Sequence, residues 1–67
     1  MILYQPVELY FVRRIRNGDE IIQSSRTIRA GIPKGMTAGE MTTFVEIKYK
    51  EVFFDGFEFD DINFLEV

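Results

Sequence analysis

Hydrophobic and polar side chains alternate along much of the chain, and two of these alternating runs flank an Asn17-Gly18 dipeptide. Alternation with a period of two is typical of a half-buried strand. Asn-Gly is a preferred pair for the centre of a type I′ turn, where both residues need φ > 0. We therefore expect a tight hairpin with Asn17 and Gly18 as its loop. This register sets Ile15 opposite Glu20.

The expected hairpin separates its side chains into two faces. The apolar face collects Val7, Leu9, Phe11, Ile15, Ile22 and Ile28, and the polar face collects Glu8, Arg14, Arg16, Asp19, Gln23, Ser25 and Thr27. Such a division is typical of an antiparallel pair with one buried face. Arg13 and Arg26 are exceptions on the apolar side, where we expect them to lie at the rim or to reach a carboxylate.

After the hairpin, three glycines and Pro33 within residues 31–39 indicate a loop. Thr37 and Glu40 have the spacing of a capping box, so a helical turn near 37–42 is expected. The run 44–54 alternates apolar residues with Glu46, Lys48 and Lys50 and is rich in β-branched and aromatic residues, which favours a strand. The alternative is a helix, which leaves Ile47 outside its apolar face.

A second turn is expected at Asp55-Gly56, followed by a strand with a break near Asp60-Asp61. These elements predict a mainly β protein, a small antiparallel sheet or barrel of four to five strands with at most one short helical turn. The alternative is an α+β protein of order ββαβ with a helix at 37–50. At this length, we expect residues 1–67 to form a single small domain.

Composition argues against several chemistries. The 67 residues include no cysteine and no histidine, so thiolate zinc sites and the commonest general base are excluded. The stretch "GIPKGMT" lacks the residue order of a phosphate-binding loop, and "DGFEFDD" lacks the ligand spacing of an EF-hand. We therefore expect no enzymatic activity, no cofactor and no metal site. No motif is specific enough to assign a family.

Charge divides the chain into a basic and an acidic half. Residues 1–34 carry six basic and three acidic side chains, whereas residues 35–67 carry two basic and eight acidic side chains. The basic hairpin suggests a nucleic-acid surface formed by Tyr10, Arg14, Arg16 and Arg29. An isoelectric point near 4.8 opposes that interpretation, so we expect instead that these arginines pair with the protein's own carboxylates.

The acidic half ends in "VFFDGFEFDDINFLEV", where phenylalanines alternate with carboxylates. In a strand, Phe57 and Phe59 point to one side, and the carboxylates form a row on the other with a spacing of ~6.8 Å. One interpretation is an amphipathic edge strand whose charges prevent aggregation. The other is a partner-binding surface. Its candidate residues are Asp55, Phe57, Glu58, Phe59, Asp60 and Asp61.

We expect a small protein-binding module that modulates or inhibits a partner protein with a basic surface, as compact viral and mobile-element proteins do. The alternatives are a nucleic-acid-binding β-barrel that uses the arginine-rich hairpin and a structural subunit of a homo-oligomer. No apolar run approaches the ~20 residues of a membrane-spanning helix, and the N-terminal residues lack a basic leader. We therefore expect no membrane association and a cytoplasmic location.

Overall fold

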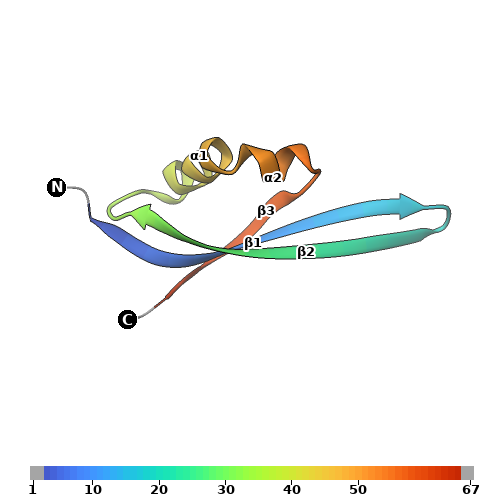
Figure 1. Ribbon diagram of the computed structural model, residues 1–67, viewed down its shortest axis with the longest axis horizontal. Coiled ribbons are helices and arrows are strands. Elements are labelled where there is room, and N and C mark those ends of the chain that lie inside the picture. Colours follow the sequence, from blue (N-terminus) through green and yellow to red (C-terminus); the bar gives the residue numbers. More distant parts are fainter. Residues whose placement is uncertain (1–2, 66–67) are drawn as a thin grey trace.

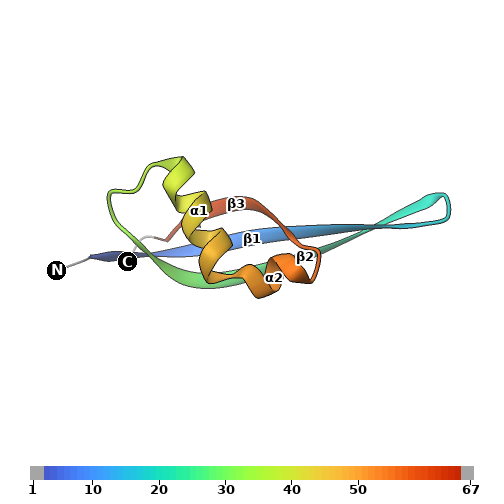
Figure 2. The ribbon, with the colours of Figure 1, turned by 90° about the horizontal axis from the view of Figure 1, so that it is seen from above.

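The computed structural model describes residues 3–65, which form three strands and two helices. In chain order they are β1 (Tyr4–Asn17), β2 (Glu20–Pro33), α1 (Ala38–Lys48), α2 (Lys50–Phe54) and β3 (Glu58–Phe64). The strands form one antiparallel sheet in the order β2-β1-β3, and both helices lie over the same face of it (Figure 1 and Figure 2). The mainly β prediction is confirmed.

The prediction of four to five strands or a barrel is wrong for the described residues. Most of the segment expected to supply a further strand is helical, so the sheet has three strands and stays open. The order of elements instead follows the α+β alternative, with the helical segment divided at Tyr49. β2 and β3 are consequently the two edges of the sheet.

The hairpin between β1 and β2 is present, but its turn differs from the expected one. Asn17 pairs with Glu20, so Gly18 and Asp19 form the loop. Gly18 has a φ of 62°, whereas Asp19, like every non-glycine residue within residues 3–65, has a negative φ. A positive φ at only the first central position is typical of a type II′ turn, which prefers glycine there. The type I′ prediction is therefore wrong.

The pairing register is correspondingly shifted by two residues from the expected one. Ile15 faces Ile22 instead of Glu20, and Phe11 faces Arg26. Because two residues are one full period of a strand, every side chain keeps its predicted face despite the shift. The apolar face is the one that the helices cover.

The core lies between this apolar face and the helices. Its buried side chains are Val7, Leu9, Phe11, Ile32, Val45 and Val52. Phe11 is central, because its ring centroid lies 6.5 Å from that of Tyr49 and 5.8 Å from those of Phe53 and Phe59. Edge-to-face and tilted pairs of this kind contribute roughly 0.5–1.5 kcal/mol each beyond the burial of their area.

Helix α1 begins with the predicted capping box. The Glu40 backbone N–H donates to Thr37 Oγ1 at 3.2 Å, and the Thr37 backbone N–H donates to Glu40 Oε1 at 3.0 Å. These two bonds satisfy backbone donors that have no partner within the helix. The helix continues to Lys48, so the expectation of a single turn near 37–42 is wrong.

The preference for a strand over 44–54 is wrong because the helical period serves the core better. Val45 and Val52 are buried in the core, and Phe44, Tyr49 and Phe53 pack against that core. Ile47 is 67% exposed, as the helical alternative requires. Packing of an apolar helix face on the sheet outweighs the β propensity of the individual residues.

Helix α2 ends in a Schellman motif at the predicted Asp55-Gly56 turn. The Gly56 N–H donates to the Phe53 carbonyl at 3.0 Å, and the Phe57 N–H donates to the Val52 carbonyl at 3.3 Å. Gly56 has a φ of 91°, a conformation that favours glycine. The turn therefore joins a helix to β3 instead of joining two strands.

The distal part of the hairpin projects from the body. β3 pairs with β1 only from Val7 to Val12, so residues 13–24 continue as a two-stranded ribbon, which we call the arm (Figure 1). The molecule is elongated, with extents of 51 × 23 × 17 Å. Ile15, Ile21 and Ile22 of the arm are 45%, 69% and 47% exposed.

Candidate functional site

The acidic segment lies along the β3 edge of the sheet, where its carboxylates and phenylalanines separate. Asp55, Glu58, Asp60 and Asp61 are exposed. Phe57 and Phe59 are half-buried and pack against the core. The six predicted residues are therefore neighbours in space, but only the four carboxylates face solvent fully. We call Asp55, Glu58, Asp60 and Asp61 the acidic edge.

The predicted break in the strand is a β-bulge at Asp60. Phe59 faces Phe11, whereas Asp61 faces Tyr10, so Asp60 is an extra residue without a partner on β1. Beyond the extra residue, side chains alternate out of phase with those before it, so Ile62 lies on the same face as Phe59. It also interrupts the row of evenly spaced carboxylates expected from simple alternation, since Glu58 and Asp61 now share the outer face.

Arg13 holds the start of this segment against the base of the arm. Its Nη1 donates to the Asp55 carbonyl at 3.1 Å, and its guanidinium carbon lies 4.7 Å from the centroid of the Phe57 ring. Arg13 was expected at a rim or on a carboxylate. It has no carboxylate partner in the described residues and binds a backbone carbonyl at the C-terminus of α2. A cation at this end of a helix is electrostatically favourable.

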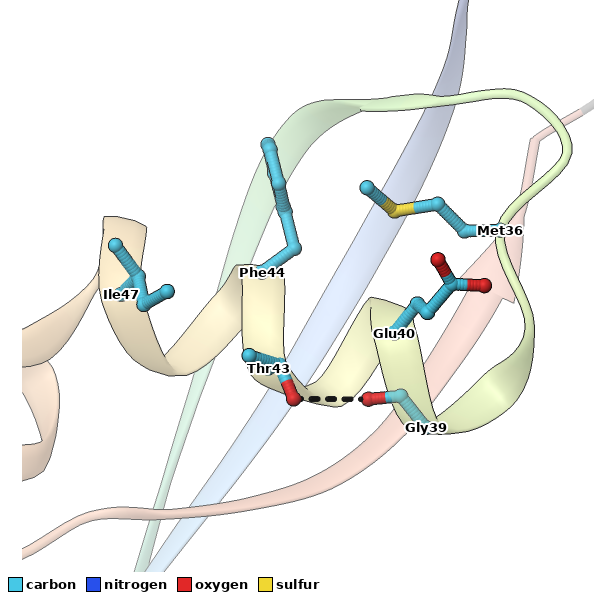
Figure 3. Close-up of a pocket in the computed structure, with 6 residues that line it drawn as sticks. All are labelled: Met36, Gly39, Glu40, Thr43, Phe44 and Ile47. Atoms are coloured by element: carbon cyan, nitrogen blue, oxygen red, sulfur yellow. Dashed lines mark hydrogen bonds between the residues drawn. The ribbon is translucent and has the colours of Figure 1, made fainter.

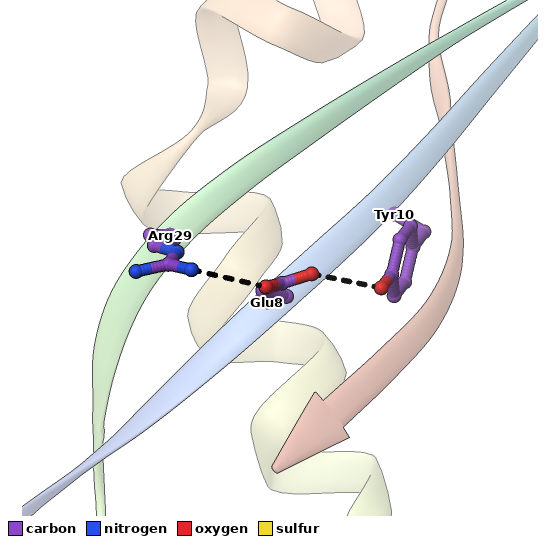
Figure 4. A network of polar contacts seen from close by, with 3 residues as sticks. All are labelled: Glu8, Tyr10 and Arg29. Atoms are coloured by element: carbon purple, nitrogen blue, oxygen red, sulfur yellow. Dashed lines mark hydrogen bonds and ion pairs between the residues drawn. The ribbon is translucent and has the colours of Figure 1, made fainter. Parts of the chain in front are cut away.

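The expected pairing of the arginines with the protein's own carboxylates is found for Arg29. Arg29 Nη2 lies 3.6 Å from Glu8 Oε1 (Figure 4), and no second ion pair is present within residues 3–65. Arg14 and Arg16 on the arm and Arg26 at its base are exposed. The basic arm and the acidic edge are thus not neutralised by contact with each other.

The nucleic-acid candidates share the outer face of the sheet but form two groups. The Tyr10 hydroxyl donates to Glu8 Oε2 at 2.8 Å, and Arg29 contacts the other oxygen of the same carboxylate (Figure 4). This hydrogen bond raises the pKa of Tyr10 above its ordinary value, and burial and the charges of Glu8 and Asp61 add to the rise. Arg14 and Arg16 lie further along β1, on the arm.

Two exposed phenylalanines at the ends of the acidic segment were missed by the sequence-based prediction. Phe54 at the end of α2 is 85% exposed, and Phe64 at the end of β3 is 47% exposed. The signal for Phe54 was present in the helical alternative, whose apolar face includes Phe53 but not its neighbour. An exposed aromatic beside the acidic edge adds an apolar contact to a surface that is otherwise charged.

A separate apolar groove lies beside α1, and none of its lining residues belongs to the acidic edge. Met36, Phe44 and Ile47 contribute its apolar side chains, and Glu40 and Thr43 contribute polar atoms (Figure 3). The Thr43 hydroxyl donates to the Gly39 carbonyl at 3.1 Å and so is already bonded within the helix. The groove is open and shallow, and no charged or titratable group other than Glu40 lines it.

Neither a metal site nor a membrane-spanning helix is evident in the described part of the chain. Residues 3–65 contain no cluster of three or more acidic side chains placed to hold a metal ion. Their helices are also too short and too polar to cross a bilayer. In comparisons with known proteins, no family model matches the chain, and no curated protein or solved structure matches it significantly.

Proposed function

We propose that the protein is a small non-enzymatic binding module that attaches through its acidic edge to a partner protein with a basic surface and thereby modulates or inhibits that partner. The observation that carries the proposal is the composition of the β3 edge. Four exposed carboxylates lie within seven residues there, and no ion pair within residues 3–65 involves any of them.

Electrostatics supports a basic partner. Like charges this close repel one another, and a basic surface relieves that repulsion while attracting the module over long range. The same charges give little affinity by themselves, because exposed pairs contribute roughly 0–1 kcal/mol. Specific attachment therefore needs an apolar anchor as well.

Phe54 supplies that anchor. It directly precedes Asp55 and is 85% exposed. Burying a phenylalanine side chain in an interface contributes about 1.5–3 kcal/mol, and aromatic residues are enriched among the residues that dominate binding energy. Phe57 and Phe59 support the acidic edge from the core side and are not expected to contact the partner directly.

The test is affinity capture with two charge-matched variants. Immobilised wild-type protein is compared with an edge variant, Glu58→Gln/Asp61→Asn, and with an arm variant, Asp19→Asn/Glu20→Gln. Each variant removes two negative charges, the first from the acidic edge and the second from the tip of the arm. We expect the wild type and the arm variant to retain the same basic protein at physiological salt and the edge variant to lose it. Equal retention by both variants, or no retained protein at all, contradicts the proposal.

A nucleic-acid-binding arm is the second candidate, and one observation favours it. Arg14 and Arg16 are exposed on one face of a projecting two-stranded ribbon, a shape that fits the major groove of DNA. This candidate predicts salt-dependent retention on an oligonucleotide that Arg14→Ala/Arg16→Ala abolishes and Lys48→Ala/Lys50→Ala preserves. Tyr10 and Arg29, both engaged by Glu8, contribute less.

A further inference from the structure

The two edges of the sheet differ in how they are protected. β3 carries a bulge and three exposed carboxylates, devices that discourage pairing with another strand. β2 runs for 14 residues without a bulge in its pairing with β1. Between Ile21 and Ile32 its only charged residues are Arg26 and Arg29. A long, regular, weakly charged edge of this kind is a template for a further strand.

The direction of the free backbone groups on β2 follows from the ladder. The Pro6 carbonyl accepts a hydrogen bond from Leu65, on the β3 side of β1, and the Leu3 carbonyl accepts one from Lys34, on the β2 side. Even-numbered residues of β1 therefore point their backbone groups toward β3, and odd-numbered residues point toward β2. With the observed register, the residues of β2 whose N–H and C=O groups face outward are Ile21, Gln23, Ser25, Thr27, Arg29 and Gly31.

We propose that this edge pairs with the β2 edge of a second copy, antiparallel about a two-fold axis at Ser25, to form a continuous six-stranded sheet. An antiparallel edge is complementary to itself under a two-fold axis, as an isologous dimer requires. In this register Ile22 of each copy faces Ile28 of the other. Arg26 faces Ser24 and Arg29 faces Ile21, so no like charges oppose each other.

The arm explains why a second copy is a better occupant than an isolated peptide. A two-stranded ribbon is only marginally stable in water, and Ile22 on the arm is 47% exposed. The dimer gives each arm a third strand from the body of the other copy. It also brings Ile22 to the mouth of a pocket between β2 and the helices, which is lined by Ile28, Tyr49 and Val52 and by the charged side chains of Arg26, Lys48, Lys50 and Glu51. The arm of one copy thus covers the open side of the other.

The register is tested by cysteine cross-linking, which the absence of native cysteine makes simple. Residues that face themselves across a hydrogen-bonded antiparallel pair have Cα atoms about 5.5 Å apart, within disulfide range. We expect Ser25→Cys to form a covalent dimer under mild oxidation. Thr27→Cys is the control, since its two copies lie roughly 13 Å apart along the strands. Cross-linking of Thr27→Cys in place of Ser25→Cys overturns the proposal.

The association itself is tested by sedimentation equilibrium. We expect a dimer at about 100 μM, well above a Kd of ~1 μM, which corresponds to roughly −8 kcal/mol. Ile22→Asp should weaken the dimer at least tenfold. Ile47→Asp, on α1 at a position that is 67% exposed against 47% for Ile22, should leave it unchanged. A monomer at every concentration, or an equal effect of both substitutions, overturns the proposal. Neither measurement involves the acidic edge, so its outcome is independent of the proposed function.

Discussion

The guanidinium carbon of Arg13 lies 4.7 Å from the centroid of the Phe57 ring, and this contact joins the base of the arm to the start of β3. The same side chain donates to the Asp55 carbonyl. Arg13 belongs to the apolar face of the hairpin, where an arginine is unusual, and its Nε is buried without a hydrogen-bond partner. The contact of its guanidinium with the Phe57 ring and its hydrogen bond to the Asp55 carbonyl compensate for the partial burial of a charged side chain.

Replacing Arg13 should therefore destabilise the fold. We expect Arg13→Ala to lower the free energy of unfolding by about 1–2 kcal/mol, because it removes a cation–π contact and a hydrogen bond to a backbone carbonyl. Arg16→Ala, which removes an exposed arginine from the arm, should change it by less than ~0.5 kcal/mol. Urea denaturation followed by circular dichroism measures both. Equal midpoints for the two variants contradict this role of Arg13.

Glycine at position 56 should be required for the same junction. An alanine there must adopt a φ near 91°, and its Cβ would lie 3.3 Å from Arg13 Cδ. We expect Gly56→Ala to cost roughly 1–2 kcal/mol, the cost of a left-handed conformation for a residue with a Cβ. Gly39→Ala is the matched control. Its Cβ meets nothing within 4 Å, and it should stabilise α1 by about 0.5–1 kcal/mol. Thermal unfolding of both variants distinguishes these opposite signs.

The capping box should make stability depend on pH through Glu40. The Thr37 backbone N–H donates to the Glu40 carboxylate and lowers its pKa below the usual value, and the Thr37 side chain contributes in the same direction. A carboxyl whose pKa is lower in the folded state stabilises the fold above the ordinary carboxyl pKa. That contribution is lost as the pH falls through the lowered pKa.

Glu40→Gln should therefore flatten the acid side of the stability profile, and Glu46→Gln, in the middle of the same helix, serves as the control. Denaturant midpoints measured from neutral pH down to about pH 3, below the ordinary carboxyl range, give the comparison. If Glu40→Gln and the wild type lose stability in parallel over this range, the capping carboxylate is not the cause.

The Glu8–Tyr10 hydrogen bond should be visible in the titration of Tyr10. Glu8 accepts from the Tyr10 hydroxyl at 2.8 Å, which raises the pKa of Tyr10, and the more distant Asp61 adds a smaller effect. We expect Glu8→Gln to lower the pKa of Tyr10 toward its ordinary value and Asp61→Asn to lower it less. Titration followed by NMR resolves Tyr10 from Tyr4 and Tyr49. A larger effect of Asp61→Asn reverses the expected order of causes.

The sequence predicted local features better than the assembly of the sheet. Alternation identified both strands of the hairpin and their faces, and the capping box marked the start of α1, because these signals depend on a few neighbouring residues. Asp55-Gly56 marked a turn, but it was expected between two strands and instead ends α2. The register was wrong because Asn17-Gly18 and Gly18-Asp19 are both acceptable loop pairs, and a shift of two residues keeps every side chain on its face, so the hydrophobic pattern does not distinguish them.

The helix at 38–48 was only the alternative to a strand in the sequence-based prediction, for a related reason. Val45 and Ile47 favour a strand locally, and only the apolar surface offered by Phe11 and Leu9 makes the helical face the better one to bury. The four carboxylates of the acidic edge are exposed, whereas their role as a binding site stays a prediction. The strand interpretation placed Phe57 and Phe59 on one side, and both pack against the core. The exposure of Phe54 depends on helix α2 and could not be derived from the strand interpretation.

The adjacent residues Phe53 and Phe54 should separate the structural from the binding contribution of the aromatic side chains. The Phe53 ring lies 5.8 Å from that of Phe11, whereas Phe54 is 85% exposed. We expect Phe53→Ala to lower the free energy of unfolding by roughly 2–3 kcal/mol, somewhat less than for a fully buried phenylalanine. Phe54→Ala should change it by less than ~0.5 kcal/mol.

Binding should show the reverse order at temperatures where both variants are folded. Phe54→Ala removes the proposed anchor next to Asp55 and should weaken capture of the basic partner about tenfold or more, since tenfold corresponds to about 1.4 kcal/mol and a lost hot-spot residue costs about 2 kcal/mol or more. Phe53→Ala leaves the exposed surface intact and should bind like the wild type. Chemical denaturation and quantitative capture on the same two proteins measure both quantities. A Phe54→Ala variant that binds normally would show that the carboxylates act without it.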